Sequence, residues 1–311
     1  MIIQTGQRTD IPAFYSEWFC NRIQAGEVLV RNPFNPQRIT RYSLSPDVVD
    51  VLGFCTKNPE PMLDHMDLLK PYKMYWFVTM TPYGRDIEPH VPPKVQVMES
   101  FKKLSTIIGR ERIAWRYDPI LLNNTYTINR HIHDFEYMAK TLAGYTNVCV
   151  ISFIDIYEKV KRNFPEARSL TKEERINLGK AIIQIAKKYN MIVRPCAEGD
   201  ELVKYGADCR GCMTREIYEE AAGTRLHFPN TKNAREECVC FLSGDIGQYD
   251  TCGHLCRYCY ANNNIERVRR NMRSHDPKSP LLIGHIQPED KIYNAKQKSW
   301  KDIQMSMFDF I

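Results

Sequence analysis

Short apolar runs alternate with amphipathic runs along the first two thirds of the chain. Each apolar run is rich in β-branched and aromatic residues and has few polar interruptions, which is typical of parallel strands buried on both faces. This alternation restricts the chain to folds in which helices cover a largely parallel sheet. The predicted strands are residues 1–5, 48–54, 74–80, 112–117, 147–154 and 191–195.

Amphipathic runs between these strands predict helices at residues 94–109, 131–144 and 171–190. In the last of them Thr171 can cap the N-terminus, and Leu178 and Ile182 lie on one apolar stripe. The first two end in glycine, a common signal for the end of a helix. Repeated alternation of strand and helix predicts an α/β fold with right-handed crossovers. The number of units in a chain of 311 residues favours a (β/α) TIM-type barrel, whole or partial, over an open sheet.

Charged side chains follow most of the predicted strands, always at the same end. Because the loops after the strands of a barrel lie on one face, these side chains are expected to surround a common site. Rim salt bridges or helix caps would explain any one of them, but their recurrence predicts a charged mouth for a polar or zwitterionic ligand. The candidate residues are Arg8, Asp10, Lys57, Arg116, Asp118, Asp155, Arg194 and Glu198.

The composition, with 43% hydrophobic and 26% charged residues, is that of a globular protein with a sizeable core. No stretch approaches the roughly 20 apolar residues of a membrane-spanning helix, and the first residues do not resemble a secretory signal. We therefore expect a cytoplasmic protein without a membrane partner. The formal net charge of +6 permits a nucleic-acid partner, but the basic run at residues 267–273 is better explained as a solvated helix face.

Eleven cysteines are unusual for such a chain, and eight of them fall between Cys196 and Cys259. Since disulfides are rare in a reducing cytoplasm, clustered thiols indicate metal ligands. Cys252, Cys256 and Cys259 form a triplet within eight residues. Structural zinc sites use four ligands, whereas three thiolates on one loop suit a cubane iron–sulfur cluster with one iron left open. The alternative is zinc, with His254 or another cysteine as the fourth ligand.

Five further cysteines precede this triplet and form a second candidate site. Cys209 and Cys212 make a CxxC pair, Cys238 and Cys240 make a CxC pair, and Cys196 follows the last predicted strand. Two close pairs separated by a longer loop bind either zinc or an iron–sulfur cluster. Cys196 is an alternative ligand to Cys209, and the identity of the metal stays open at this point.

The triplet, with Tyr258 directly before Cys259, resembles the signature of radical S-adenosylmethionine (SAM) enzymes. That resemblance implies a 4Fe–4S cluster held by Cys252, Cys256 and Cys259, with the free iron binding SAM. It also implies a partial or full α/β barrel and an electron donor such as flavodoxin or ferredoxin. The implied reaction is reductive cleavage of SAM to a 5′-deoxyadenosyl radical, which acts on an unknown substrate.

A closer resemblance, over nearly the whole chain, is to the bacterial family called domain of unknown function 1848 (DUF1848). It is carried by the stretches RTDIPAFYSEWF, VLVRNPFNPQ, TKNP, WRYDPIL and DIGQYDTCGHLCRYCYAN. The C-terminal cysteines of that family are likened to the radical SAM cluster site. The resemblance favours Cys196, Cys212, Cys238 and Cys240 as the second ligand set, because Cys209 is less usual in it.

Two features depart from the ordinary radical SAM pattern. The triplet normally follows the first strand, whereas here it follows all the predicted strands. In a closed barrel the last strand neighbours the first, so a loop after a final strand at residues 238–244 would reach the same mouth. The glycine-glycine-glutamate stretch that binds the SAM amino group is also missing, and the strand-end charges are the candidates to replace it.

We expect one domain, with a barrel body over residues 1–225 and a cysteine-rich segment with a docking tail over residues 226–311. Trp300, Met305 and Phe308 indicate that the tail packs on the body. The leading functional hypothesis is a radical SAM-like iron–sulfur enzyme. Its rival is a metal-stapled nucleic-acid-binding or repair-associated protein without SAM chemistry. An electron carrier is less favoured, because such a protein needs no barrel.

Overall fold

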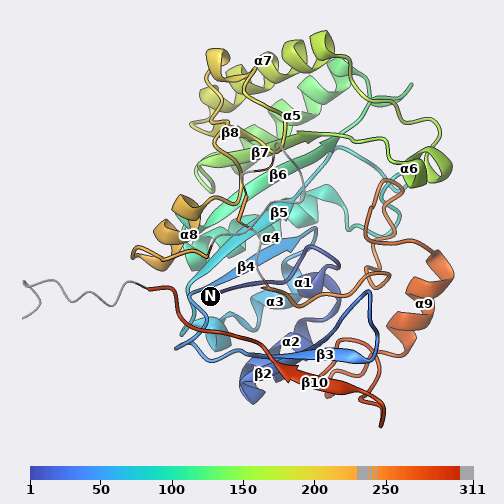
Figure 1. Cartoon of the computed structure of the whole chain (residues 1–311). Helices are drawn as coiled ribbons and strands as arrows, with labels where there is room; N and C mark the ends of the chain where they lie inside the picture. Colours follow the sequence, from blue (N-terminus) through green and yellow to red (C-terminus); the bar gives the residue numbers. More distant parts are fainter. Residues whose placement is uncertain (230–237, 239, 242–243, 302–311) are drawn as a thin grey trace, which may run out of the picture.

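A seven-stranded parallel sheet forms the centre of the computed structural model, which describes residues 1–229, 238, 240–241 and 244–301 (Figure 1). The strand order is β8-β7-β6-β5-β4-β1-β9, and every neighbouring pair is parallel. All six predicted strands are present, with small differences at their ends. The strands are β1 (Ile2–Gln4), β4 (Val51–Thr56), β5 (Met74–Thr79), β6 (Ile113–Ile120), β7 (Val148–Phe153), β8 (Ile192–Pro195) and β9 (Gly244–Asp245).

The sheet is not closed into a barrel. In the described part of the chain β8 and β9 form its two edges and do not pair with each other. A TIM barrel needs eight paired strands, whereas the described residues between β8 and β9 form a loop, a helix and the second group of cysteines. The prediction of an α/β fold is confirmed. The predicted TIM-type barrel, whole or partial, is not found, because the sheet in the described part of the chain is open.

Helices cover the sheet where the sequence pattern predicts them, at α4 (Lys94–Ile108), α5 (Ile128–Leu142) and α7 (Lys172–Lys188). The N-terminus of α7 is a capping box, in which the backbone N–H groups of Thr171 and Glu174 each donate to the other residue's side chain. The shorter helices are α1 (Ile11–Phe14), α2 (Ser16–Ala25), α3 (Glu60–Leu63), α6 (Glu158–Asn163), α8 (Arg215–Ala222) and α9 (Ile265–Arg273). Within the described ranges, 3₁₀ turns span Met66–Leu69, Arg110–Arg112 and Val203–Tyr205.

A second sheet of three strands, which the sequence pattern does not predict, joins segments from near the two ends of the chain. β2 (Glu27–Arg31) and β3 (Arg38–Ser43) pair antiparallel, and β10 (Lys291–Asn294) pairs parallel to β3. The indole N–H of Trp18 also donates to the carbonyl of Ser279 at 2.9 Å. The described part of the C-terminal segment is therefore built into both sheets, through β9 and β10.

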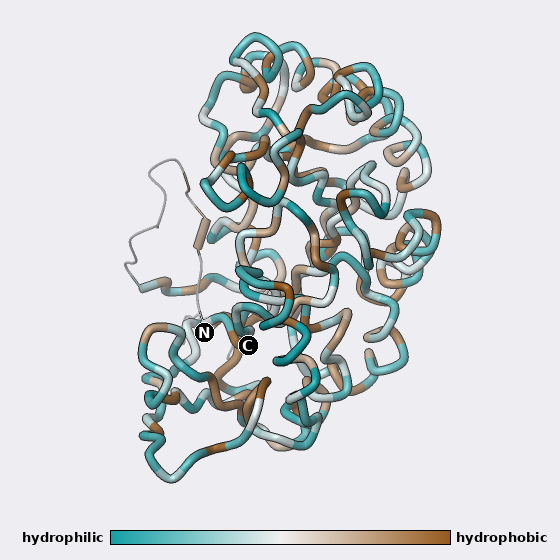
Figure 2. Tube along the Cα trace, turned by 90° about the vertical axis from the view of Figure 1, so that its right-hand side faces the viewer, coloured by the Kyte–Doolittle hydropathy of each residue, from teal (hydrophilic) through white to brown (hydrophobic). Residues whose placement is uncertain are grey.

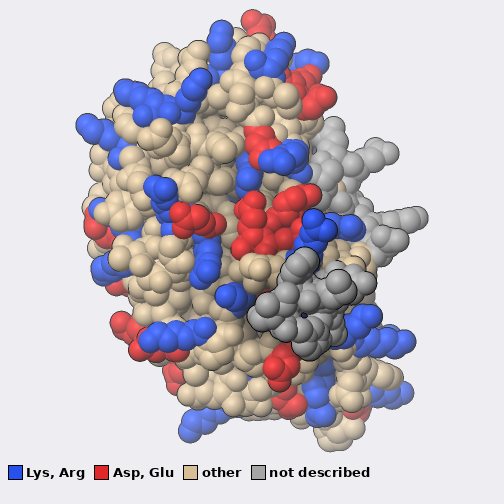
Figure 3. Space-filling model, turned by 90° about the vertical axis from the view of Figure 1, so that its left-hand side faces the viewer, with Lys and Arg blue, Asp and Glu red and all other residues tan. Residues whose placement is uncertain are grey.

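Aromatic side chains fill much of the core. Phe54 stacks on Trp76 with ring centroids 3.9 Å apart, and Trp115 stacks on Phe135 at 4.7 Å. In Figure 2 the outer turns of the trace are mostly hydrophilic, as expected when apolar strands are buried. On the opposite face, Figure 3 shows several acidic side chains gathered near the middle, with basic side chains around them. None of the described helices has the length and apolarity to cross a membrane.

The C-terminal tail packs on the body as far as it is described. Trp300 is 9% exposed, and its backbone N–H donates to Oδ2 of Asp50, in the body, at 2.8 Å. This contact agrees with the predicted docking of the tail. Met305 and Phe308, the other residues of that prediction, lie outside the described residues.

Glycine is required at position 6, just after β1. A Cβ atom on Gly6 would lie 2.2 Å from the carbonyl oxygen of Cys55 in β4. Gly6→Ala must therefore push the two chain segments apart, and we expect it to lower the free energy of unfolding by about 1–3 kcal/mol. Urea denaturation of the variant and the wild type measures this difference. Equal midpoints would show that the loop relaxes freely around the added methyl group.

Candidate metal centres at the strand ends

The cysteine triplet reaches the carboxyl ends of the strands through β9. Parallel pairing of β9 with β1 places Asp245 opposite Gln4. Arg8, in the loop after β1, forms an ion pair with Asp245 at 2.7 Å. The chain leading to the triplet therefore lies beside the first strand, as predicted. β9 is shorter than predicted and begins at Gly244, the last residue of the predicted range 238–244. Part of that range lies outside the described residues.

Contacts from the segments that follow β1 and β5 hold the triplet loop in place. The hydroxyl of Tyr15, between α1 and α2, donates to the carbonyl of Thr251 at 2.6 Å. The backbone N–H of Arg257 donates at 3.0 Å to the carbonyl of Ile87, which lies between β5 and α4. In Figure 1 the loop runs between α6 and α9. These contacts fix the three thiols relative to the ends of the central strands.

The three thiols of the triplet are half-buried and influence one another. Burial, the Asp10 carboxylate and the other two thiols raise the pKa of Cys252, and burial raises the pKa of Cys256. The backbone N–H of Ala261 donates to the sulfur of Cys259 at 3.3 Å. Thiolates in this setting need a cation to stabilise them, and a bound metal ion supplies that charge.

Both ring nitrogens of His254 have partners other than the triplet. Nε2 lies 2.9 Å from Oδ2 of Asp10, and Nδ1 lies 3.4 Å from the carbonyl oxygen of His90. The ring also packs edge-on against Phe14, with centroids 4.6 Å apart. Use of His254 as a fourth zinc ligand would break its contact with Asp10. The geometry therefore favours three protein ligands over the zinc alternative with His254.

A buried group of charges lies next to the triplet loop. Asp10 accepts a hydrogen bond from the backbone N–H of Lys57 at 2.7 Å, and Nζ of Lys57 pairs with Glu88 at 2.7 Å. Glu88 is 1% exposed and also contacts Lys94 and the hydroxyl of Tyr258. Burial acts to raise the pKa of Glu88, but the two ammonium groups outweigh it and lower the pKa to about 2. The buried carboxylate of Glu88, held between two lysines, thus also holds the triplet loop through the hydroxyl of Tyr258.

The second cysteine group is also assembled. The sulfur of Cys212 lies 3.2 Å from that of Cys196 and 3.3 Å from that of Cys240. Hydrogen bonds with the thiols of Cys212 and Cys240 lower the pKa of Cys196. The same contacts with Cys196 raise the pKa of Cys212 and of Cys240. Cys238 contacts the thiol of Cys240. The structure thus brings together Cys196, Cys212 and Cys240 as a group that can hold a metal ion, and among the described residues Cys238 is not part of that group.

Arg116 connects the second cysteine group to the other strand-end charges. Its guanidinium donates to the sulfur of Cys212 at 3.6 Å and forms an ion pair with Asp118. Although burial opposes it, Glu88 and, more weakly, Asp118 raise the pKa of Lys57. Arg116 therefore lies next to the second cysteine group, and its partner Asp118 interacts with Lys57 near the triplet loop.

The remaining predicted site residues have local partners. Arg194 forms an ion pair with Asp208 at 3.0 Å. Glu198 accepts a hydrogen bond from the backbone N–H of Phe153 at 2.7 Å, and burial raises its pKa to about 7. Asp155 is exposed. The contacts of Arg194 and Glu198 agree with a supporting role at the rim, and a role in ligand binding stays a prediction for all three residues.

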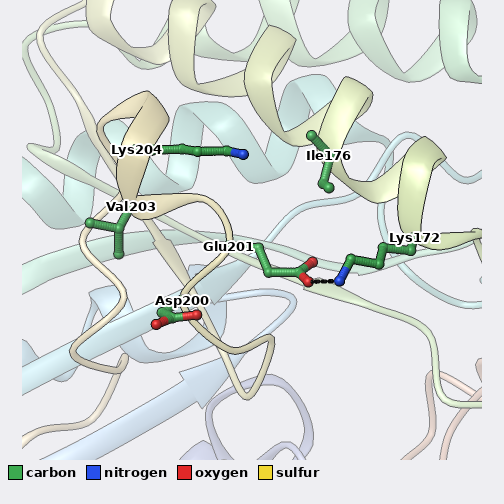
Figure 4. Close-up of a pocket in the computed structure, with 6 residues that line it drawn as sticks. All are labelled: Lys172, Ile176, Asp200, Glu201, Val203 and Lys204. Carbon is green, nitrogen blue, oxygen red and sulfur yellow. Dashed lines mark ion pairs between the residues drawn. The ribbon is translucent and has the colours of Figure 1, made fainter.

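Two cavities lie near the β8 edge of the sheet. One, of about 240 Å³, has Cys209 and Cys240 among its lining residues. The other, of about 390 Å³, lies between α7 and the turn at Val203–Tyr205, and Figure 4 shows the ion pair of Lys172 and Glu201 in its wall. The larger cavity is lined by no thiol. Of these two cavities, the smaller one adjoins a cysteine group.

The model of one protein family, described as domain of unknown function 1848, matches residues 2–261. The matched range contains both cysteine groups and all seven strands of the large sheet described above. No curated protein matches the chain. Because the family model spans most of the sequence, this chain belongs to the DUF1848 family.

Proposed function

We propose that this protein is an iron–sulfur enzyme of the radical SAM type, with its catalytic cluster on Cys252, Cys256 and Cys259. The observation that carries the proposal is a loop of three half-buried thiols beside the strand ends, with His254 held by Asp10. Three thiolates leave one iron of a 4Fe–4S cluster without a protein ligand. The amino and carboxylate groups of SAM can bind such an iron.

The spread of the triplet sulfurs supports a cluster over a single ion. Among the described residues, the triplet does not form a group whose ligand atoms all lie within 4.8 Å of one another. Sulfurs around one zinc ion lie about 3.8 Å apart, given a Zn–S distance of about 2.3 Å and tetrahedral geometry. In a cubane each thiolate binds a different iron, so the sulfurs are farther apart. The donor set therefore fits a cluster.

The nearby charges would bind and orient the polar groups of SAM and of the substrate. A bound cluster would supply the electron that cleaves SAM to a 5′-deoxyadenosyl radical, and a small carrier such as flavodoxin or ferredoxin would deliver that electron. Lys57 lies close enough to Cys256 for their charges to interact, and Glu88 keeps the lysine ionised. An ammonium group in that position can attract a carboxylate. Arg116 and Asp118 offer further charge along the strand ends.

The rival hypothesis, a metal-stapled nucleic-acid-binding protein, has weaker support. In α9 Val268 is buried, Arg267 pairs with Asp250 and Arg269 pairs with Glu266. Ion pairs within the protein leave fewer cations for phosphate groups. These observations fit a solvated helix face better.

A turnover assay under anaerobic conditions tests the proposed function. Protein reduced with dithionite and supplied with SAM is expected to release 5′-deoxyadenosine, which chromatography and mass spectrometry quantify. Samples without dithionite are the control, because the cleavage needs an electron. A protein with its full complement of iron and sulfide that releases no nucleoside would refute the SAM chemistry and leave the iron–sulfur assignment standing.

A further inference from the structure

The second cysteine group differs from the triplet in the distances between its sulfurs. The sulfurs of Cys196, Cys212 and Cys240 all lie within 4.8 Å of one another, and the two contacts of Cys212 measure 3.2 and 3.3 Å. A disulfide would bring two sulfurs to about 2.05 Å and leave the third apart. A cubane needs wider spacing, because its thiolates bind different irons. The observed distances are nearest to the separation of about 3.8 Å around one tetrahedral zinc ion.

We propose that Cys196, Cys212, Cys238 and Cys240 bind one zinc ion in a closed tetrathiolate site, and not a second iron–sulfur cluster. The fourth ligand is Cys238, which is two residues before Cys240 in the sequence and whose thiol hydrogen-bonds with that of Cys240. Its sulfur lies outside the group formed by the other three, so zinc binding would have to draw it toward them. Four cysteines fill the tetrahedral coordination of zinc and leave no position for a substrate. The site is therefore structural, and it does not depend on the SAM chemistry proposed for the triplet.

The surroundings of these sulfurs suit a buried negative centre. Cys212 is 2% exposed and Cys240 is 4% exposed. Zinc with four thiolates is a dianion, so it needs donors or cations close by. Arg116 supplies one, since its guanidinium lies 3.6 Å from the sulfur of Cys212. The backbone N–H of Met213 supplies another, donating to the sulfur of Cys240 at 3.3 Å. Such outer contacts orient and stabilise metal-bound thiolates.

The ligands connect segments that belong to the two open edges of the large sheet. Cys196 follows β8, the strand at one edge, and Cys240 precedes β9, the strand at the other edge. Cys212 lies shortly before α8. A zinc ion bound to all of them would fasten the segment between β8 and β9 to the strand ends without backbone pairing. It would also hold Arg116 in position beside Asp118.

The test is the metal content of the full-length protein purified anaerobically from cells given both zinc and iron. A variant with Cys252→Ala, Cys256→Ala and Cys259→Ala isolates the second group. We expect it to keep one zinc ion per chain without acid-labile sulfide, and X-ray absorption should show four sulfurs about 2.3 Å from the zinc. Cys212→Ser should lose the zinc, whereas Cys209→Ser, at a neighbouring thiol, should keep it.

In the variant that lacks the three triplet cysteines, iron bound to the second cysteine group, with or without sulfide, would overturn the proposal. A folded triplet variant without metal, or loss of zinc from Cys209→Ser, would overturn the proposed ligand set. If a variant does not fold, X-ray absorption at the zinc edge of the wild type gives the same readout without any substitution. Failure of the SAM assay would leave these results unchanged, so the two proposals fail separately.

Discussion

Replacing Cys256 by alanine is expected to abolish both the iron–sulfur cluster and the release of 5′-deoxyadenosine. The triplet supplies three thiols, and a 4Fe–4S cluster with an open iron needs all of them. The anaerobically purified variant should therefore contain no iron and no sulfide, which elemental analysis measures. Its release of nucleoside should fall to the level seen without dithionite.

Cys209→Ser is the matched control for this result. Cys209 is half-buried in the cysteine-rich part of the chain, like Cys256, but it does not belong to the triplet. The control should keep iron, sulfide and turnover at wild-type levels. A Cys256→Ala protein that still held a complete cluster would show that another side chain can serve as ligand, against the three-thiolate assignment.

Glu88→Gln is expected to destabilise the fold by about 3–5 kcal/mol. Glu88 is 1% exposed and pairs with both Lys57 and Lys94, so glutamine would leave two ammonium groups without their counter-charge. Urea unfolding at equal metal content measures the change. The control is Glu99→Gln, because Glu99 pairs with Lys102 at 2.5 Å on the surface. Loss of this surface ion pair should lower the free energy of unfolding by less than about 1 kcal/mol. Equal effects of the two substitutions would contradict the buried ion pairs.

The contribution of Glu88 depends on pH in a defined direction. Its pKa is lowered from 4.5 to about 2 in the folded protein, so its ionisation stabilises the fold fully above about pH 4.5. That stabilisation is lost as the pH falls from 4.5 toward 2. The stability difference between the wild type and Glu88→Gln should therefore shrink over this range. A difference that stayed constant would contradict an ionic origin.

The large sheet is predictable from sequence because buried parallel strands and amphipathic helices leave strong local patterns. β9 leaves no such pattern, since it is two residues long and its place is set by pairing with β1. Local sequence patterns also do not show whether the sheet closes into a barrel, because closure depends on whether two strands far apart in the sequence pair with each other. In the small sheet, β10 is missed because every one of its residues is exposed, so no apolar alternation marks it.

The candidate ligands are predictable because cysteine spacing is itself a chemical signal. Their grouping is less so, since Cys196 and Cys240 are brought together only by the fold. Glu88 and Lys94 are missed altogether. An acidic residue in a loop and a lysine at the start of a helix resemble ordinary surface residues, and their burial against Lys57 appears only in three dimensions.

Electron paramagnetic resonance of the dithionite-reduced protein, recorded with and without SAM, tests most directly whether the triplet leaves one iron open. A reduced 4Fe–4S cluster on Cys252, Cys256 and Cys259 should give a signal whose g values shift when SAM is added. A cluster signal that SAM leaves unchanged, or zinc in place of iron at these three thiols, would contradict the proposed chemistry.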